Sequence, residues 1–182
     1  MANNPLLLSS ENIFQYLAAR NLVDLGQKDN WQIKPLSGKN FNLSIRSPDG
    51  GMLLKQERLT PNGTMLGELL NESVICQLLQ QLSLAAGLAN TFNPQVIDFD
   101  RDNSTIIFQF LSDYQDLSFL YTGKQDRWSV KIPATIGKTI ATVHQLTFDR
   151  QDYWNFLIEN LDGGLAKSLV KIGRLRDRKS VV

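Results

Sequence analysis

The sequence predicts an α+β fold, in which a five-stranded antiparallel sheet with one inserted helix is followed by helices alone. Three observations predict it. Residues 31–57 alternate between apolar and polar side chains on either side of two short turns. A run of helix formers at 64–84 then interrupts the strand pattern, which resumes over residues 94–111. After Leu111 only helical patterns follow.

The bulk composition excludes several classes of protein. The chain has 182 residues, of which 42% are hydrophobic and 20% charged, as in ordinary globular proteins. A net charge of +1 gives no electrostatic footprint for nucleic acid. One histidine and one cysteine cannot make a zinc site, and Cys76 is interpreted as a small core residue. No apolar run approaches the ~20 residues that cross a membrane, so we expect a cytoplasmic protein without a membrane partner.

The first three strands are expected after an N-terminal helical segment, residues 1–30. Trp31–Leu36 alternates as a strand would, and its Pro35 favours an edge strand or the end of a strand. Phe41–Arg46 is the second strand, with its apolar residues on one face. A turn at Ser47–Gly51 leads into the third strand, Met52–Gln56, in which alternation places Lys55 on the face of Leu53.

The inserted helix and the last two strands follow. The apolar positions of the 64–84 run fall on one helical face: Leu66, Leu69, Leu70, Val74, Leu78 and Leu82. Pro94–Asp100 then has the pattern of a strand, and Thr105–Leu111 is apolar enough to be a buried one.

Helices are expected in the remainder of the chain. A short helix at 117–121 precedes a longer one that starts at Pro133, with Ile136, Ile140 and Val143 facing inward. His144 lies near the end of that helix and is interpreted as structural. A final helix over 152–162 is predicted to end at Gly163-Gly164.

The loop before the second strand is similar to a phosphate-covering loop. Gly38-Lys39-Asn40-Phe41-Asn42 resembles the Gly-Gly-x-x-Asn loop of the aminoglycoside phosphotransferase and choline kinase family, with Lys39 where a second glycine often stands. Lys55 lies 17 positions after Gly38, and Glu72 lies 17 positions further on, inside the inserted helix. Phe108–Leu111 resembles the strand that leads into the hinge, and 136–144 the helix closed by a histidine.

This resemblance implies a kinase-like small lobe followed by the first helices of an incomplete helical large lobe. It implies five segments: a helical segment (1–30), the small lobe (31–111), a hinge (112–116), the start of the large lobe (117–165) and a tail (166–182).

The resemblance also implies roles for single residues. Lys55 would meet the α- and β-phosphates of ATP, and a helix glutamate would pair with it. Glu68 and Glu72 share a helix face and either could reach Lys55, with Glu72 in the better register. Asn42 would brace the loop of Gly38 and Lys39. The adenine would bind at the hinge strand, whose last residues are Gln109, Phe110 and Leu111. Taken singly, several of these residues have ordinary alternatives: a hairpin glycine at 38, a surface Asn42 and a solvated Lys55.

The family's catalytic and metal-holding residues have no match. The family has a catalytic aspartate, an asparagine five positions later and a further aspartate for magnesium, all after the helix that ends in histidine. Asp162-Gly163-Gly164 does not fit this pattern, and Asp98 with Asn103 has the spacing but precedes the hinge. We therefore expect the nucleotide-binding part of an ATP- and Mg-dependent phosphotransferase that acts on a small-molecule hydroxyl, truncated and inactive by itself.

Two other functions are compatible with the same residues. One is a non-catalytic kinase-like module that binds a nucleotide or a protein. The other is an unrelated α+β adaptor. The acceptor substrate of the phosphotransferase is unknown, because acceptor residues would lie in the absent part of the large lobe.

The C-terminal residues suggest how a truncation could arise. Asp177–Val182 followed by a stop is what one reading frame of a widely used sequencing adapter encodes, so the tail is hypothesised to be artefactual. A natural stop codon just after codon 176 in the source DNA would contradict this. A truncated large lobe would also leave apolar surface exposed on the helices after residue 130.

Overall fold

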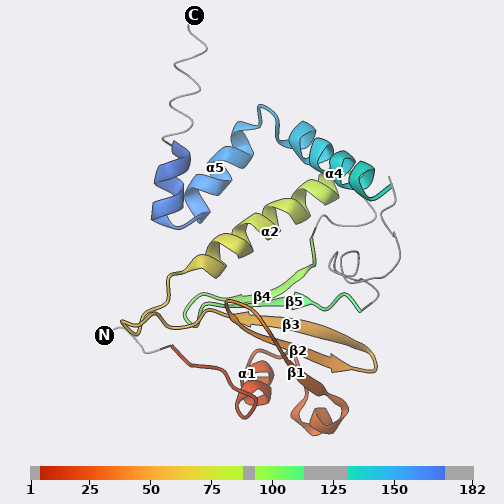
Figure 1. Cartoon of the computed structure of the whole chain (residues 1–182), viewed down its shortest axis with the longest axis vertical. Helices are drawn as coiled ribbons and strands as arrows, with labels where there is room; N and C mark the ends of the chain where they lie inside the picture. Colours follow the sequence, from red (N-terminus) through yellow and green to blue (C-terminus); the bar gives the residue numbers. More distant parts are fainter. Residues whose placement is uncertain (1–4, 88–92, 113–130, 171–182) are drawn as a thin grey trace, which may run out of the picture.

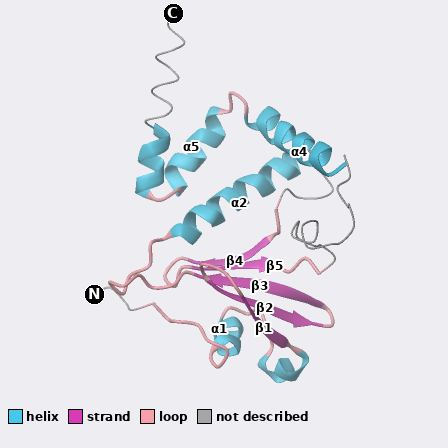
Figure 2. Ribbon diagram, in the orientation of Figure 1, coloured by secondary structure: helices cyan, strands magenta, loops and turns pink. Residues whose placement is uncertain are grey.

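The computed structural model describes residues 5–87, 93–112 and 131–170. It is an α+β structure around one five-stranded antiparallel sheet with the strand order β1-β2-β3-β5-β4 (Figures 1 and 2). The strands are β1 (Gln32–Leu36), β2 (Phe41–Ser47), β3 (Gly50–Gln56), β4 (Val96–Asp100) and β5 (Thr105–Gln109). The helices are α1 (Ile13–Ala19), α2 (Glu68–Ala85), α4 (Lys131–Thr147) and α5 (Gln151–Asn160), with a 3₁₀ helix η1 (Leu25–Asn30).

The sheet and the helix inserted between β3 and β4 are confirmed. Pro35 lies in β1, which is an edge strand as predicted. Some bounds differ from the prediction: α2 begins at Glu68 and β5 ends at Gln109. The 3₁₀ helix η1 was not predicted. Of the predicted hinge only Ser112 is described, and the short helix at 117–121 lies outside the described residues.

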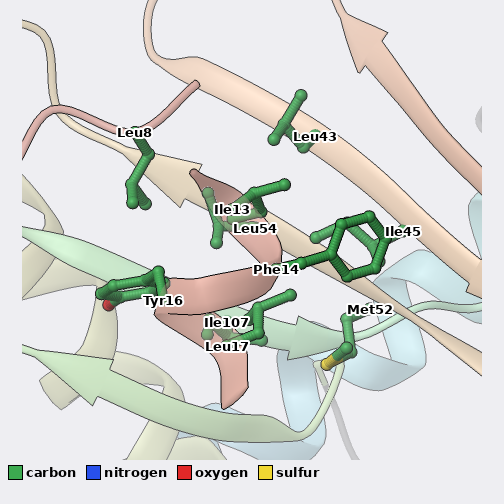
Figure 3. Close-up of a cluster of buried hydrophobic side chains, with 10 residues drawn as sticks. All are labelled: Leu8, Ile13, Phe14, Tyr16, Leu17, Leu43, Ile45, Met52, Leu54 and Ile107. Atoms are coloured by element: carbon green, nitrogen blue, oxygen red, sulfur yellow. The ribbon is translucent and has the colours of Figure 1, made fainter. Parts of the chain in front are cut away.

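Helix α1 covers one face of the sheet and α2 lies across the other (Figure 1). The main hydrophobic core lies on the α1 face, where side chains of α1 pack against those of β2, β3 and β5 (Figure 3). Its buried members are Leu8, Ile13, Phe14, Tyr16, Leu17, Leu43, Ile45, Met52, Leu54 and Ile107. Because side chains alternate along a strand, Leu53 and Lys55 of β3 lie on the opposite face, toward α2. The predicted orientation of Lys55 is confirmed.

A buried glutamine attaches the N-terminal segment to the sheet. Gln56 is only 2% exposed and lies on the α1 face at the end of β3. Its Oε1 accepts from the backbone N–H of Leu8 at 2.8 Å, and its Nε2 donates to the carbonyl oxygens of Leu6 at 2.8 Å and Asn103 at 3.1 Å. A buried amide must be satisfied in this way, because an unpaired one destabilises the fold.

The aspartates at the end of β4 attach α1 to the sheet. Asp100 Oδ2 accepts from the Tyr16 hydroxyl at 3.0 Å, from Arg20 Nη1 at 3.1 Å and from Asn103 Nδ2 at 2.7 Å. Arg20 Nε also pairs with Asp98. The Asp98/Asn103 spacing, set aside in the sequence as a chance match to a catalytic pair, thus belongs to a structural cluster.

The C-terminal helices lie on the side of α2 away from the sheet (Figure 1). No residue of α4 or α5 is buried within the described part of the chain. The prediction that Ile136 and Ile140 face inward is therefore wrong: they are 44% and 51% exposed, because no described element covers them. His144 is exposed as well, so it is not a buried structural histidine.

The chain turns at Asp162, between α5 and one more helical stretch over 163–170. The prediction that a helix ends at Gly163-Gly164 is wrong, because these glycines begin the next helix, and the predicted boundary at 165/166 falls inside it. Asp162 Oδ1 accepts from the N–H groups of Gly164 at 2.8 Å and Leu165 at 3.2 Å. Its Oδ2 and N–H bond the Asn71 side chain of α2. Asp162 thus joins this turn to α2.

None of the helices in the described ranges is both long and apolar enough to cross a membrane.

Candidate functional site

Lys55 and Glu72 form an ion pair between β3 and α2. Lys55 Nζ lies 2.6 Å from Glu72 Oε1, and the two side chains are 28% and 34% exposed. The ammonium group also lies 5.3 Å from the centroid of the Phe108 ring on β5, within the range of a cation–π interaction. Of the two glutamates that the sequence left open, Glu72 is the partner of Lys55.

The position of α2 depends on a buried carboxylate just after β3. Glu57 is 4% exposed. Its Oε1 accepts from the N–H of Leu66 at 3.0 Å, and its Oε2 from the N–H of Gly67 at 2.9 Å and the Ser104 hydroxyl at 2.7 Å. The first N–H groups of a helix lack partners within it and favour a negative charge. Glu57 also accepts from the N–H of Glu68, the first residue of α2, at 3.4 Å, so it holds the segment that leads into the helix. The left-handed conformation of Gly67, with a φ of +77°, is not helical and explains the later start at Glu68.

The loop between β1 and β2 approaches the same face. Gly38 has a φ of +153°, and a Cβ added there would lie 2.6 Å from Asn42 Nδ2. Asn42 is the register partner of Lys55 across β2 and β3, so both side chains lie on the α2 face. Asn42 Oδ1 is buried and has no hydrogen-bond partner in the described ranges. Only a glycine fits beside Asn42 without displacing it.

Lys39, next along the loop, pairs with the other glutamate. Its Nζ lies 2.5 Å from Glu68 Oε2, with side chains 73% and 45% exposed. Glu68 and Glu72 are separated by about one helical turn. The structure therefore brings Gly38, Lys39, Asn42, Lys55 and Glu72 together along one side of the sheet.

The three residues predicted to contact the adenine lie at the end of β5 and just after it, further along the strand than Ile106, the register partner of Lys55. The N–H of Gln109 donates to the Gln95 carbonyl at 2.8 Å, and that of Phe110 to the Gly51 carbonyl at 2.9 Å. Phe110 stacks with Arg46, whose guanidinium carbon lies 4.0 Å from the ring centroid. An adenine could therefore not be bound through the N–H groups of these two residues. Leu111 is half-buried, and the hinge beyond Ser112 lies outside the described residues.

Cys76 lies one helical turn beyond Glu72 on α2 and is half-buried. Burial raises the pKa of its thiol, and the nearby Glu72 carboxylate raises it further. A thiol with a raised pKa is a weak nucleophile at neutral pH. The interpretation of Cys76 as a packing residue fits this environment.

The residues that the structure describes contain no group of three or more His, Cys, Asp or Glu side chains that could hold a metal ion. Asp162, the aspartate of the Asp-Gly-Gly stretch, is hydrogen-bonded to the Asn71 side chain and to the backbone of the turn that follows it. The side-chain hydrogen bond from Asn71 is the main reason that the pKa of Asp162 lies below its usual value. The described residues therefore do not fit a magnesium site.

Comparison of the chain with models of protein families, with curated proteins and with solved structures gave no match. The kinase-like assignment stays a prediction that depends on the residues themselves.

The sequence did not indicate the role of Glu57 or the pairing of Lys39 with Glu68. Glu57 gave no local signal, because its backbone partners lie 9 to 11 positions later in the chain and Ser104 lies 47 positions later. The Lys39–Glu68 pair spans 29 positions and was not considered. The burial of Gln56 could have been predicted, because alternation along β3 places Gln56 on the same buried face as Leu54.

Proposed function

We propose that this chain binds the phosphates of ATP, as the nucleotide-binding part of a phosphotransferase of the aminoglycoside phosphotransferase type. The observation that supports this most is the pair of Lys55 on β3 with Glu72 on the helix inserted after β3. Phosphoryl transfer requires a fixed cation at the phosphates, and a lysine held by a carboxylate and an aromatic ring meets this requirement.

The surroundings of Lys55 fit an anionic ligand. The ammonium group is oriented by Glu72, and the Lys55 side chain as a whole is 28% exposed, so the residue is not fully enclosed. Gly38 brings the loop backbone close to the same face of the sheet, and backbone N–H groups near a glycine are common phosphate ligands. ATP would supply the transferred phosphoryl group. Lys55 would bind and orient its phosphates.

The proposal for the described residues is limited to nucleotide binding. Transfer to a small-molecule hydroxyl needs an aspartate base and metal-holding groups, and the described residues do not fit a metal site. No step through magnesium is derived from them. The acceptor and the transfer step belong to the whole enzyme of this type.

Titration calorimetry with ATP tests the proposal. We expect ATP to bind, and Lys55→Ala to weaken the affinity about tenfold or more, since a bond between charged groups contributes roughly 1.5–3 kcal/mol. Glu72→Gln should weaken binding less, because the lysine keeps its charge and loses only its orientation.

The matched control is Lys138→Ala, which removes an exposed lysine on α4. It should leave the affinity for ATP unchanged. A wild-type protein that binds no ATP, or equal losses in Lys55→Ala and Lys138→Ala, would refute the proposal and favour an adaptor in which the hairpin only packs.

A further inference from the structure

Two lysines form ion pairs with two glutamates on the same face of α2. Glu68 holds Lys39 and Glu72 holds Lys55. Because residues four apart on a helix are neighbours, the two carboxylates lie roughly 5–6 Å apart at their Cβ atoms. Each ammonium group lies against its own carboxylate, so both positive charges face the same side of α2. A polyphosphate chain, which carries several neighbouring negative charges, could contact both.

The two pairs differ in how firmly they are held. Lys55 is mostly buried, is fixed to a strand and contacts the Phe108 ring. The Lys39 side chain is 73% exposed, extends from a loop, and has a partner that is 45% exposed. Exposed ion pairs contribute little to stability and are screened by salt, so Lys39 can exchange its carboxylate for another anion at little cost.

The Lys39 side chain extends away from the strands. Gly38, the residue before it, lies close to Asn42 of β2, whereas the Lys39 side chain is 73% exposed. Movement of the side chain alone is therefore enough to bring its ammonium group away from Glu68.

We propose that Lys39 is a second phosphate-binding cation, which Glu68 holds when no nucleotide is bound and releases to the polyphosphate of ATP. Glu68 is then a competitor of the ligand, whereas Glu72 supports it. This inference rests on the proposed function, because it assigns a further residue to the same nucleotide site.

The first test compares ATP with adenosine, using calorimetry at low ionic strength. Lys39→Ala is expected to weaken ATP binding about fivefold and to leave adenosine binding unchanged. Inorganic tripolyphosphate should displace ATP from the wild type and do so less well from Lys39→Ala. Lys138→Ala is again the matched control.

The second test is a double-mutant cycle, which separates release of Lys39 from a general loss of negative charge. Glu68→Gln should tighten ATP binding several-fold in the wild type and have little effect in the Lys39→Ala background. Glu159→Gln, which removes one exposed carboxylate on α5, should change neither. If Glu68→Gln tightens binding equally in both backgrounds, Lys39 is not the group that Glu68 restrains.

The outcomes separate the two proposals. Binding that depends on Lys55 and not on Lys39 would overturn the second cation and leave the proposed function standing. Absence of ATP binding in the wild type would overturn both.

Discussion

At the scale of single residues, two features favour a glycine at position 38: its backbone conformation and the close approach of Asn42. Its φ of +153° is rare for residues with a side chain, and a Cβ would lie 2.6 Å from Asn42 Nδ2. Gly50, in the turn between β2 and β3, has the same φ and nothing within 4 Å of an added Cβ. A substitution at Gly50 would therefore test backbone strain alone, whereas the same substitution at Gly38 would add a steric contact with Asn42.

We expect Gly38→Ala to destabilise the fold more than Gly50→Ala. Each substitution imposes backbone strain of about 1–3 kcal/mol, and only the first also displaces Asn42. Chemical denaturation measures both. Combining Gly38→Ala with Asn42→Ala should recover the part of the lost stability that is due to the contact with Asn42. Equal losses of stability in Gly38→Ala and Gly50→Ala would show that Asn42 does not restrict this position.

Asp100 gives the fold a residue-level dependence on pH. Although burial alone would raise it, hydrogen bonds from Asn103 and Tyr16, together with the Arg20 charge, hold the pKa of this carboxyl below its usual value. A carboxyl with a lowered pKa stabilises the fold fully above the unfolded value of about 3.9. That stabilisation is lost as the pH falls through the folded-state pKa.

The free energy of unfolding of the wild type should therefore fall more steeply between pH 5 and pH 2 than that of Asp100→Asn. Asp102→Asn, which changes an exposed aspartate nearby, is the control and should follow the wild type. Urea denaturation across this pH range provides the measurement. Parallel curves for all three proteins would contradict a stabilising charge at Asp100.

At the scale of elements, α2 depends on a carboxylate that is not part of it. Glu57 accepts hydrogen bonds from the N–H groups of Leu66 and Gly67 and from the Ser104 hydroxyl. Removing a buried acceptor leaves its donors unsatisfied, at a cost of about 1–3 kcal/mol for each group that water cannot reach.

Glu57→Ala should destabilise the protein by about 2–3 kcal/mol, and Glu57→Gln by less, because one acceptor oxygen remains. Circular dichroism during thermal unfolding checks both, with Glu159→Ala on α5 as an exposed control. If Glu57→Ala unfolds at the same temperature as the wild type, water can replace the carboxylate as the hydrogen-bond acceptor.

The elements were predictable to the extent that their signals are local. Alternation along 41–56 and Pro35 in the edge strand identified the strands, because each strand has one face on the core. The start of α2 was predicted four residues too early, at Thr64. The residues from Thr64 to Gly67 lie outside the helix, and the N–H of Gly67 donates to Glu57. Caps supplied from another element have no signature in the helix itself.

The candidate site was predictable only in part, for a similar reason. Strand parity predicted the face on which Lys55 lies, and helix spacing left Glu68 and Glu72 as candidates; the family resemblance favoured Glu72, which is the partner in the structure. The Lys39–Glu68 pair could not be anticipated, since it depends on how a flexible side chain in a loop meets the first turn of α2. Asp98 with Asn103 was set aside as a catalytic pair, but the role of Asp98 and Asp100 in attaching α1 depends on tertiary contacts that no local pattern shows.

At the scale of the whole molecule, the C-terminal helices leave apolar side chains on the surface. Ile136 and Ile140 on α4 are about half exposed, and Phe148 after it is 76% exposed. The expected exposure of apolar surface after residue 130 is confirmed for these residues. Apolar groups that gather on one surface favour association between molecules.

We therefore expect the protein to self-associate as its concentration rises, with an average mass that increases in sedimentation equilibrium. A variant with Ile136→Gln and Ile140→Gln should associate less. Ile75→Gln, at a residue of α2 that is 43% exposed, is the control and should not reduce association. A strictly monomeric wild type at high concentration would contradict the prediction.

The single cysteine gives this arrangement a practical consequence. Cys76 follows Glu72 by one turn of α2 and is half-buried, and the charges of Glu72 and Lys55 both act on the pKa of its thiol. The rate at which a thiol-reactive dye modifies the unaltered protein therefore reports on the surroundings of this turn of α2, through the exposure and the pKa of the thiol. A ligand that tightens the pair should slow the dye, and Glu72→Gln should speed it, without any engineered label.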